Sequence, residues 1–223
     1  MPAISVVVFD VNETLSDLAP LARRFADVGA SPALARLWFA ELLRDGFALT
    51  SLGESAPFAD LGREGLRLLL RQEKLNDDLE AAVAYVMAGF ADLGVHPDVV
   101  PGVRALRESG TRLVTLSNGA AAVAERLLTE AGIRKHFEQV LTVEDAGLWK
   151  PAARAYQYSA EMCATDLAQM LMVAVHPWDI HGAASAGMRT AWINRNSGAY
   201  PTHFHTPDHI VTGLAELADA KIL

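Results

Sequence analysis

Side chains that could carry out nucleophilic chemistry follow four apolar stretches of the sequence. The first is Asp10, with a hydroxyl four positions later at Thr14. An ionised carboxylate can attack an electrophilic centre and form a covalent intermediate. Taken alone, an acid at this place is at least as typical of a helix N-cap. Asp10 is therefore a candidate nucleophile that needs partners elsewhere in the chain.

Three further polar groups lie in comparable places. Ser117, Asn118 and Gly119 form a turn that can present backbone N–H groups to an anion at a helix start. Lys150 precedes a proline, and Asp179 comes shortly after another apolar stretch. Separately, these are a common capping turn, a surface lysine and an isolated acid. In an open α/β sheet, however, ligands bind beyond the carboxyl ends of the strands, where all four groups are expected.

The apolar stretches themselves predict the fold. Residues 4–9 form a continuous β-branched and aromatic run, which is typical of a strand buried on both faces of a parallel sheet. Similar short runs occupy residues 112–116, 139–143, 170–175 and 190–193, separated by helical patterns. The right-handed crossover rule then favours an α/β fold with a doubly wound, mostly parallel, Rossmann-like sheet.

A glycine and a proline predict where two helices of this region end and begin. Gly132 is expected to end a helix in the left-handed conformation. Pro151 is suited to the first turn of a helix.

The stretch between residues 16 and 94 has a different pattern. Apolar residues recur there at helical spacing, namely Leu34, Leu37, Trp38, Leu42 and Leu43, and later Leu66, Leu69 and Leu70. An insertion of this length after the first strand exceeds a simple crossover connection. We therefore expect a helical cap subdomain at residues 16–94, inserted into an α/β core domain of residues 1–15 and 95–223.

The order of these groups, Asp, Thr, Ser-Asn, Lys-Pro and Asp at successive strand ends, resembles the haloacid dehalogenase superfamily. The Lys-Pro stretch that ends at Tyr156 and the Trp-Ile-Asn-Arg of residues 192–195 are similar to the L-2-haloacid dehalogenase (type II) branch. This resemblance covers essentially the whole chain. It implies an aspartate nucleophile, an ester intermediate on carbon and a helical cap over the site.

Carried over residue by residue, the resemblance makes Asp10 the nucleophile and Lys150 the cation that holds it ionised and close. Thr14, Ser117 and the backbone around Asn118 match positions that hold the nucleophile and the substrate carboxylate, and Asp179 matches the acid that orients Lys150 or the hydrolytic water. The catalytic set is Asp10, Thr14, Ser117, Lys150 and Asp179. The substrate-binding set is Asn12, Trp38, Phe39, Leu43, Phe58, Asn118, Tyr156, His176 and Trp178.

Most members of the superfamily are magnesium-dependent phosphatases, and this sequence departs from their pattern at two places. Asn12 stands where those enzymes have a proton-donating acid, and Val175 stands where they have a metal-binding acid. A phosphoryl group would be poorly neutralised in such a site. His203 and His205 fall short of a zinc signature. We therefore predict no metal and no cofactor.

The sequence also departs from the dehalogenase branch. Phe39 replaces an arginine that cradles the departing halide, His176 replaces an asparagine, and Asn12 replaces an aromatic residue. Arg36 lies one helical turn before Phe39 and could stand in for the arginine, whereas Arg44 is expected to face away. His176 is either a charge or hydrogen-bond partner of the halide or a strand-end histidine satisfied by its neighbours.

The resulting hypothesis is a hydrolytic dehalogenase of small (S)-2-haloalkanoic acids. Two alternatives are a phosphatase-like hydrolase of the same fold and an anion-binding member with impaired catalysis. The partners implied are the haloacid, water and released halide, with a homodimer left open.

Composition narrows the partners and the location. The chain has 223 residues and a net charge of −8, which argues against a nucleic-acid-binding surface. Cys163 is the single cysteine. Without apolar runs long enough for a membrane span or the marks of a signal peptide, we expect a cytoplasmic protein.

Overall fold

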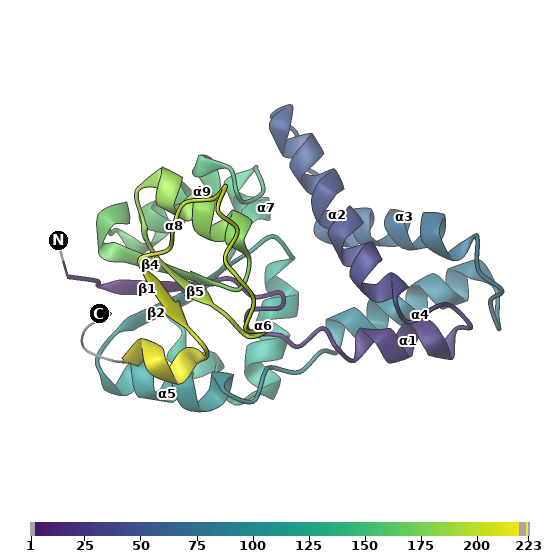
Figure 1. Cartoon of the computed structure of the whole chain (residues 1–223), viewed down its shortest axis with the longest axis horizontal. Helices are drawn as coiled ribbons and strands as arrows, with labels where there is room; N and C mark the ends of the chain where they lie inside the picture. The colour runs from purple at the N-terminus through teal and green to yellow at the C-terminus, as the bar shows by residue number, and fades with distance from the viewer. Residues whose placement is uncertain (1–2, 219–221, 223) are drawn as a thin grey trace. The chain divides into compact units, whose positions relative to one another are not determined.

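A computed structural model describes residues 3–218 and residue 222 of the chain. The chain divides into two compact units, one made of Met1–Ser16 and Gly94–Leu223 and the other of Asp17–Leu93. The larger unit contains the sheet and the smaller one is helical (Figure 1). The sequence placed the boundaries at residues 15/16 and 94/95.

Within the described residues, the larger unit has one six-stranded sheet in the order β3-β2-β1-β4-β5-β6, and every neighbouring pair is parallel. The strands are β1 (Val6–Phe9), β2 (Arg112–Ser117), β3 (Gln139–Thr142), β4 (Met170–Ala174), β5 (Arg189–Ile193) and β6 (His209–Val211). The predicted doubly wound α/β fold is therefore confirmed. Strand β1 lies between β2 and β4, at the point where the strand order reverses, and such a switch point is where open α/β sheets bind ligands.

Helices cover both faces of this sheet. In Figure 1, α8 and α9 lie on one face, while α5 and the C-terminal 3₁₀ turn η3 lie on the other. The helical segments of this unit are α5 (Val99–Glu108), α6 (Ala121–Glu130), η1 (Arg134–His136), α7 (Val143–Ala146), α8 (Ala153–Cys163), η2 (Leu167–Gln169), α9 (Pro177–Ala186) and η3 (Leu214–Ala218). Burial on both faces explains why the central strands read as unbroken apolar runs.

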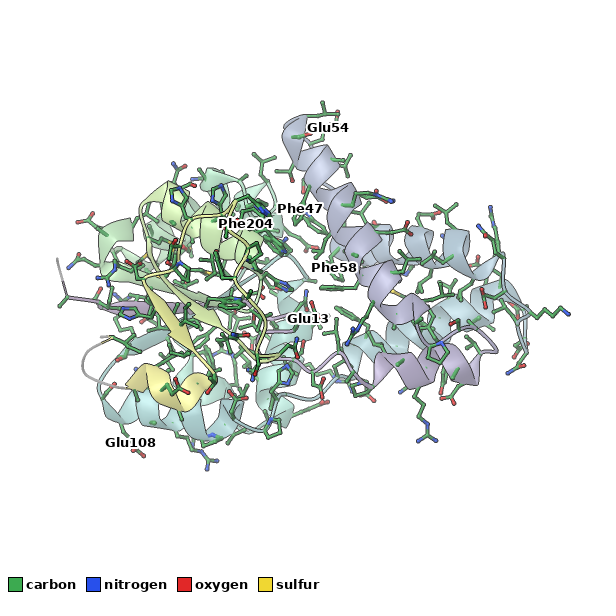
Figure 2. The ribbon with its side chains drawn as sticks, in the orientation of Figure 1. Glu13, Phe47, Glu54, Phe58, Glu108 and Phe204 are labelled. Carbon is green, nitrogen blue, oxygen red and sulfur yellow. The ribbon has the colours of Figure 1, made fainter. Side chains whose placement is uncertain are left out.

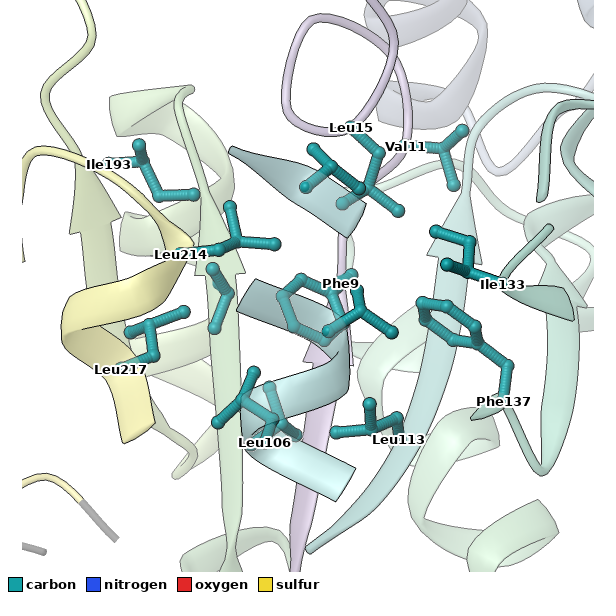
Figure 3. Close-up of a cluster of buried hydrophobic side chains, with 14 of the residues drawn as sticks. Phe9, Val11, Leu15, Leu106, Leu113, Ile133, Phe137, Ile193, Leu214 and Leu217 are labelled. Carbon is teal, nitrogen blue, oxygen red and sulfur yellow. The ribbon is translucent and has the colours of Figure 1, made fainter. Parts of the chain in front are cut away.

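The core of this unit packs around β1. Phe9 is fully buried and meets Phe137 edge to face, with ring centroids 5.9 Å apart. Val11 and Leu15, from the loop after β1, belong to the same apolar cluster as Ile193, Leu214 and Leu217 from the other end of the chain (Figure 3). The loop that carries the candidate nucleophile is thus anchored by two apolar side chains.

The helical unit contains α1 (Leu21–Asp27), α2 (Leu34–Ser51), α3 (Phe58–Leu70) and α4 (Leu79–Ala91). Trp38 is fully buried, and its indole N–H donates to the carbonyl of Gly62 at 2.9 Å. A β-carbon at Gly62 would come within 3.3 Å of the Trp38 ring, so glycine lets α2 and α3 approach closely. None of the described helices is long and apolar enough to cross a membrane.

The structure confirms one of the two predicted helix boundaries, shifts the other and adds a strand. Gly132 adopts φ 69° after α6, as predicted for a helix end. Pro151, by contrast, precedes α8, which begins at Ala153. The residue before it, Lys150, exchanges two backbone hydrogen bonds with the Asn118 side chain. Residues 209–211 were not among the predicted strands but form β6, a three-residue edge strand with too short an apolar pattern to be recognised.

Candidate active site

The candidate nucleophile lies directly beyond the carboxyl end of the central strand. Asp10 follows β1, its backbone N–H donates to the carbonyl of Val173 at 3.0 Å, and the residue is only 3% exposed. The chain then turns sharply, because the carbonyl of Val11 accepts hydrogen bonds from the N–H groups of both Leu15 and Ser16. This turn brings Thr14 back beside Asp10.

Each carboxylate oxygen of Asp10 has its own donor. The Thr14 hydroxyl donates to Oδ2 at 2.6 Å, and the Lys150 ammonium donates to Oδ1 at 2.9 Å. The Thr14 oxygen in turn accepts the backbone N–H of Val175 at 3.1 Å, just beyond β4. The carboxylate is therefore held in orientation by groups from three strand ends.

Lys150 is shared between two buried acids. Its ammonium also donates to Asp179 Oδ2 at 2.6 Å, and both Lys150 and Asp179 are fully buried. Burial lowers the pKa of Lys150, but the charges of Asp10 and Asp179 outweigh it and leave this pKa above the usual value. Burial and the nearby Asp10 raise the pKa of Asp179, against the opposing effect of Lys150. The cluster thus depends on one ammonium to balance two carboxylates.

Tyr156 holds the other side of Asp179. Its hydroxyl donates to Asp179 Oδ1 at 2.6 Å, and burial together with the Asp179 charge raises the pKa of this phenol well above its usual range. Tyr156 is itself fully buried. The Tyr156 hydroxyl is thus bound to Asp179, and a contact of Tyr156 with substrate stays a prediction.

The side chain of Asn118 binds the backbone of Lys150. Its side-chain oxygen accepts the N–H of Lys150 at 3.0 Å, and its amide group donates to the carbonyl of Lys150 at 3.2 Å. The side chain is therefore occupied in fixing the backbone of the lysine, and only the backbone around Asn118 is left to contact a ligand. Nearby, Ser117 Oγ accepts the N–H of Gly119 at 2.9 Å, which orders the turn after β2.

His176 caps the start of α9 beside the nucleophile. Its Nε2 lies 3.2 Å from the carbonyl of Asn12, 3.7 Å from Asp10 Oδ2 and 3.6 Å from Glu13 Oε2. All three of these neighbours are hydrogen-bond acceptors. The ring of Trp178 stacks on His176 with centroids 5.0 Å apart. The His176 ring therefore lies beside the Asp10 carboxylate with Nε2 facing it.

The sequence analysis missed one unusual residue in this loop. Glu13 adopts φ 61°, a left-handed conformation that is uncommon outside glycine. Its N–H donates to Ser16 Oγ at 3.3 Å, and its carbonyl is 3.0 Å from His96 Nε2. Figure 2 shows Glu13 on the loop beyond β1. Glutamate gives no sequence signal of such a conformation, which explains the omission.

The remaining predicted residues lie in the helical unit. Phe39 and Phe58 pack against each other with ring centroids 6.5 Å apart, and Phe58, labelled in Figure 2, stacks on Phe90 at 5.2 Å. Leu43 is also buried. Arg36 is exposed, and Arg44 is exposed and pairs with Glu41 and Asp45. The role of Trp38, Phe39, Leu43 and Phe58 in binding substrate stays a prediction.

Chemically, the core-unit site offers a positioned and desolvated carboxylate next to a buried ammonium. Desolvation makes the oxygen a better nucleophile, and the ammonium 2.9 Å away balances its negative charge. No group of three or more His, Cys, Asp and Glu side chains suited to a metal ion occurs in the part of the chain that the structure describes. The absence of a metal from the reaction stays a prediction.

Comparisons with known proteins agree with this arrangement. The model of the haloacid dehalogenase-like hydrolase family matches residues 4–187. An (S)-2-haloacid dehalogenase of Pseudomonas putida is 28% identical over 98% of this chain and 97% of its own, and haloacetate dehalogenase H-2 of Moraxella sp. (strain B) is 29% identical over 95% of each. A crystal structure of an L-2-haloacid dehalogenase superimposes with a TM-score of 0.90, 30% identity and coverage of 97% of this chain and 98% of the other.

Proposed function

Because this chain belongs to the haloacid dehalogenase-like hydrolases, we propose that it hydrolyses the carbon–halogen bond of small (S)-2-haloalkanoic acids through an ester on Asp10. The observation that carries the proposal is the arrangement Thr14–Asp10–Lys150–Asp179–Tyr156, in which one buried ammonium serves two carboxylates. The relatives that act on haloacids supply the substrate class.

In the first step, a lone pair of an Asp10 carboxylate oxygen attacks C2 of the haloacid from the side opposite the halogen. The new C–O bond forms as the carbon–halogen bond breaks, and the bonding electrons leave with the halide. Asp10 becomes a neutral ester, so the carboxylate charge leaves the buried cluster. Lys150 and Asp179 then balance each other, which favours this intermediate over the crowded starting charges.

In the second step, water attacks the ester carbonyl carbon of Asp10. Cleavage of the bond between that carbon and the ester oxygen releases the 2-hydroxy acid, and the Asp10 carboxylate is regenerated with loss of one proton. Lys150 and Thr14 donate to the Asp10 oxygens and stabilise the negative charge that grows on them. Configuration at C2 is inverted once, in the first step.

The residues around Asp10 also suggest how the substrate is bound. We infer that the Ser117 hydroxyl and the backbone N–H of Asn118 bind the substrate carboxylate, since this turn precedes the start of α6. His176 lies beside the nucleophile and Trp178 stacks on the His176 ring, and both are proposed to contact the substrate. On the resemblance to the dehalogenase branch, Trp38, Phe39, Leu43 and Phe58 of the helical unit are proposed as substrate contacts.

A direct test measures halide release from chloro-, bromo- and fluoroacetate and from both enantiomers of 2-chloropropionate. The proposal expects release from the (S) enantiomer with formation of the (R) hydroxy acid, and no release by Asp10→Asn. Asp17→Asn is the matched control, because Asp17 lies in the same part of the sequence and bonds only to the exposed N–H of Ala19 among the interactions described. Retention of activity by Asp10→Asn excludes this nucleophile, and inactivity of the wild type on every haloacid excludes the substrate class.

We also infer that the enzyme works in the cytoplasm without nucleic-acid or membrane partners. The acidic net charge of −8 and the single cysteine support this view. A homodimer stays open.

A further inference from the structure

Arg195 joins three segments of the core unit that are far apart in sequence. Its Nη2 donates to the carbonyl of Thr14 at 2.8 Å, and its Nη1 donates to Asp98 Oδ1 at 2.8 Å. The second oxygen of Asp98 accepts the N–H of Leu214 at 2.9 Å. The guanidinium thus connects the nucleophile loop to the start of α5 and, through Asp98, to η3.

The surroundings make this connection rigid. The side chain of Arg195 is 16% exposed, and it lies two residues beyond Ile193, whose side chain belongs to the apolar cluster of Figure 3 together with Leu15 and Leu214. Burial raises the pKa of Asp98, but the hydrogen bonds from Arg195 and Leu214 outweigh it and lower this pKa below the usual value. A planar guanidinium with fixed donors loses less freedom per hydrogen bond than a flexible lysine.

The target of Arg195 is the residue that orients the nucleophile. Thr14 has its carbonyl bound by Arg195, while its hydroxyl donates to Asp10 Oδ2 and accepts the N–H of Val175. Fixing the carbonyl restrains the peptide plane that follows Thr14, and with it the position of the Thr14 Cα from which the hydroxyl projects. Arg195 does not contact Asp10 in any interaction described, so its influence passes through Thr14.

The chain segments that lead out of the core unit and back into it are also hydrogen-bonded to each other. Ser16 pairs with Val95 in an antiparallel bridge, and the N–H of His96 donates to the carbonyl of Leu15 at 2.9 Å. Asp98 follows His96 by two residues and binds Arg195. The outgoing and returning segments are thus tied to each other and to the nucleophile loop.

We propose that Arg195, anchored by Asp98, is a positioning residue that sets the geometry of the Asp10 nucleophile through Thr14. This inference rests on the proposed function for its kinetic consequences. Misplacing a reacting group by about 1 Å costs on the order of 100-fold in rate. Loss of Arg195 is therefore expected to lower kcat by roughly 10- to 100-fold while KM changes little, since no substrate contact is removed.

The test compares Arg195→Gln with Arg189→Gln. Arg189 begins β5, the strand that ends two residues before Arg195. It is likewise mostly buried and pairs with an aspartate, Asp208, at 3.3 Å, but it has no described contact with Thr14. Arg189→Gln is expected to keep kcat within about twofold of the wild type at matched folded fraction. Equal loss of kcat in both variants overturns the proposal, because that pattern indicates general destabilisation.

A double-mutant cycle with Thr14→Val tests the route. If Arg195 acts through Thr14, Arg195→Gln adds little to the loss already caused by Thr14→Val. If the double variant instead loses kcat by the product of the two single losses, the two residues act independently and the route through Thr14 is wrong. If Arg195→Gln fails to fold, Asp98→Asn against Asp208→Asn gives the same comparison, because it weakens the anchor and keeps the guanidinium.

An activity-independent measurement separates this inference from the proposed function. Hydrogen exchange of the Val175 N–H, which is bound by the Thr14 hydroxyl, should be faster in Arg195→Gln than in the wild type and unchanged in Arg189→Gln. Unchanged exchange in Arg195→Gln refutes the positioning role. Absence of halide release by the wild type refutes only the proposed function, and the exchange result still stands.

Discussion

Replacement of Lys150 by methionine probes the charge balance of the buried site most sharply. The two side chains have similar length, so Lys150→Met removes the ammonium with little change in volume. Asp10 and Asp179 then lack the cation that lies 2.9 Å and 2.6 Å from their oxygens, and their side chains are 4% and 0% exposed. Removing one partner from a buried ion pair typically costs about 3–5 kcal/mol.

The pH dependence of that loss can be worked out. Without Lys150, the fully buried Asp179 avoids an unbalanced charge by binding a proton, so its pKa in the folded state rises further. Holding a proton on a carboxyl group with an ordinary pKa near 4 costs about 1.4 kcal/mol for each pH unit above that value. The expected loss in the free energy of unfolding is therefore about 4 kcal/mol at pH 7 and about 1.5 kcal/mol at pH 5.

The sign follows from linkage. A carboxyl group whose folded-state pKa is raised contributes stability below its unfolded pKa and loses that contribution as pH rises toward the folded value. Urea unfolding of the wild type and Lys150→Met between pH 5 and pH 8 measures the difference. Lys135→Met, at an exposed lysine, is the control and should stay within about 0.5 kcal/mol of the wild type. A deficit in Lys150→Met that is independent of pH would refute the shared-ammonium account.

Three further outcomes are expected. Tyr156→Phe removes the donor to Asp179 Oδ1, so urea unfolding should show a loss of about 1–3 kcal/mol, and halide release should slow; unchanged stability contradicts the observed hydrogen bond. Phe39→Arg should speed release of chloride and bromide by up to roughly 100-fold in steady-state assays if the halide lacks a cationic partner, while Arg36→Ala should have no effect; a large loss in Arg36→Ala instead identifies Arg36 as that partner. Exhaustive chelation should leave halide release intact, because Lys150 already occupies the position between the two carboxylates; recovery of lost activity by magnesium supports a metal-dependent hydrolase.

The sequence predicted those features that depend on local pattern. A strand buried on both faces must be apolar throughout, so residues 112–116 and 170–175 closely anticipated β2 and β4. Asp10, Lys150 and Asp179 were each found as polar residues after apolar runs or before a helix. The parallel sheet then brings such positions to one edge, and the structure joins these three through the Lys150 ammonium.

Contacts between distant segments could not be predicted in the same way. Asn118 holds the backbone of Lys150 32 positions away, and Arg195 reaches Thr14 across 181 positions. Neither residue type nor spacing predicts such a pairing, because an asparagine in a turn and an arginine after a strand are both common at protein surfaces. Strand β6 was missed for another reason: three residues at a sheet edge, with Ile210 exposed, carry too little apolar pattern.

The central claim is that Asp10 forms an ester whose carbonyl carbon is attacked by water. A single turnover with enzyme in excess over (S)-2-chloropropionate, run in water enriched in oxygen-18, tests it directly. The account predicts that the label enters the Asp10 carboxylate, read by mass spectrometry of the peptide that contains it, while the hydroxy acid carries unlabelled oxygen. Label in the hydroxy acid after that first turnover, with Asp10 unlabelled, would contradict the account, because it requires direct attack of water on C2.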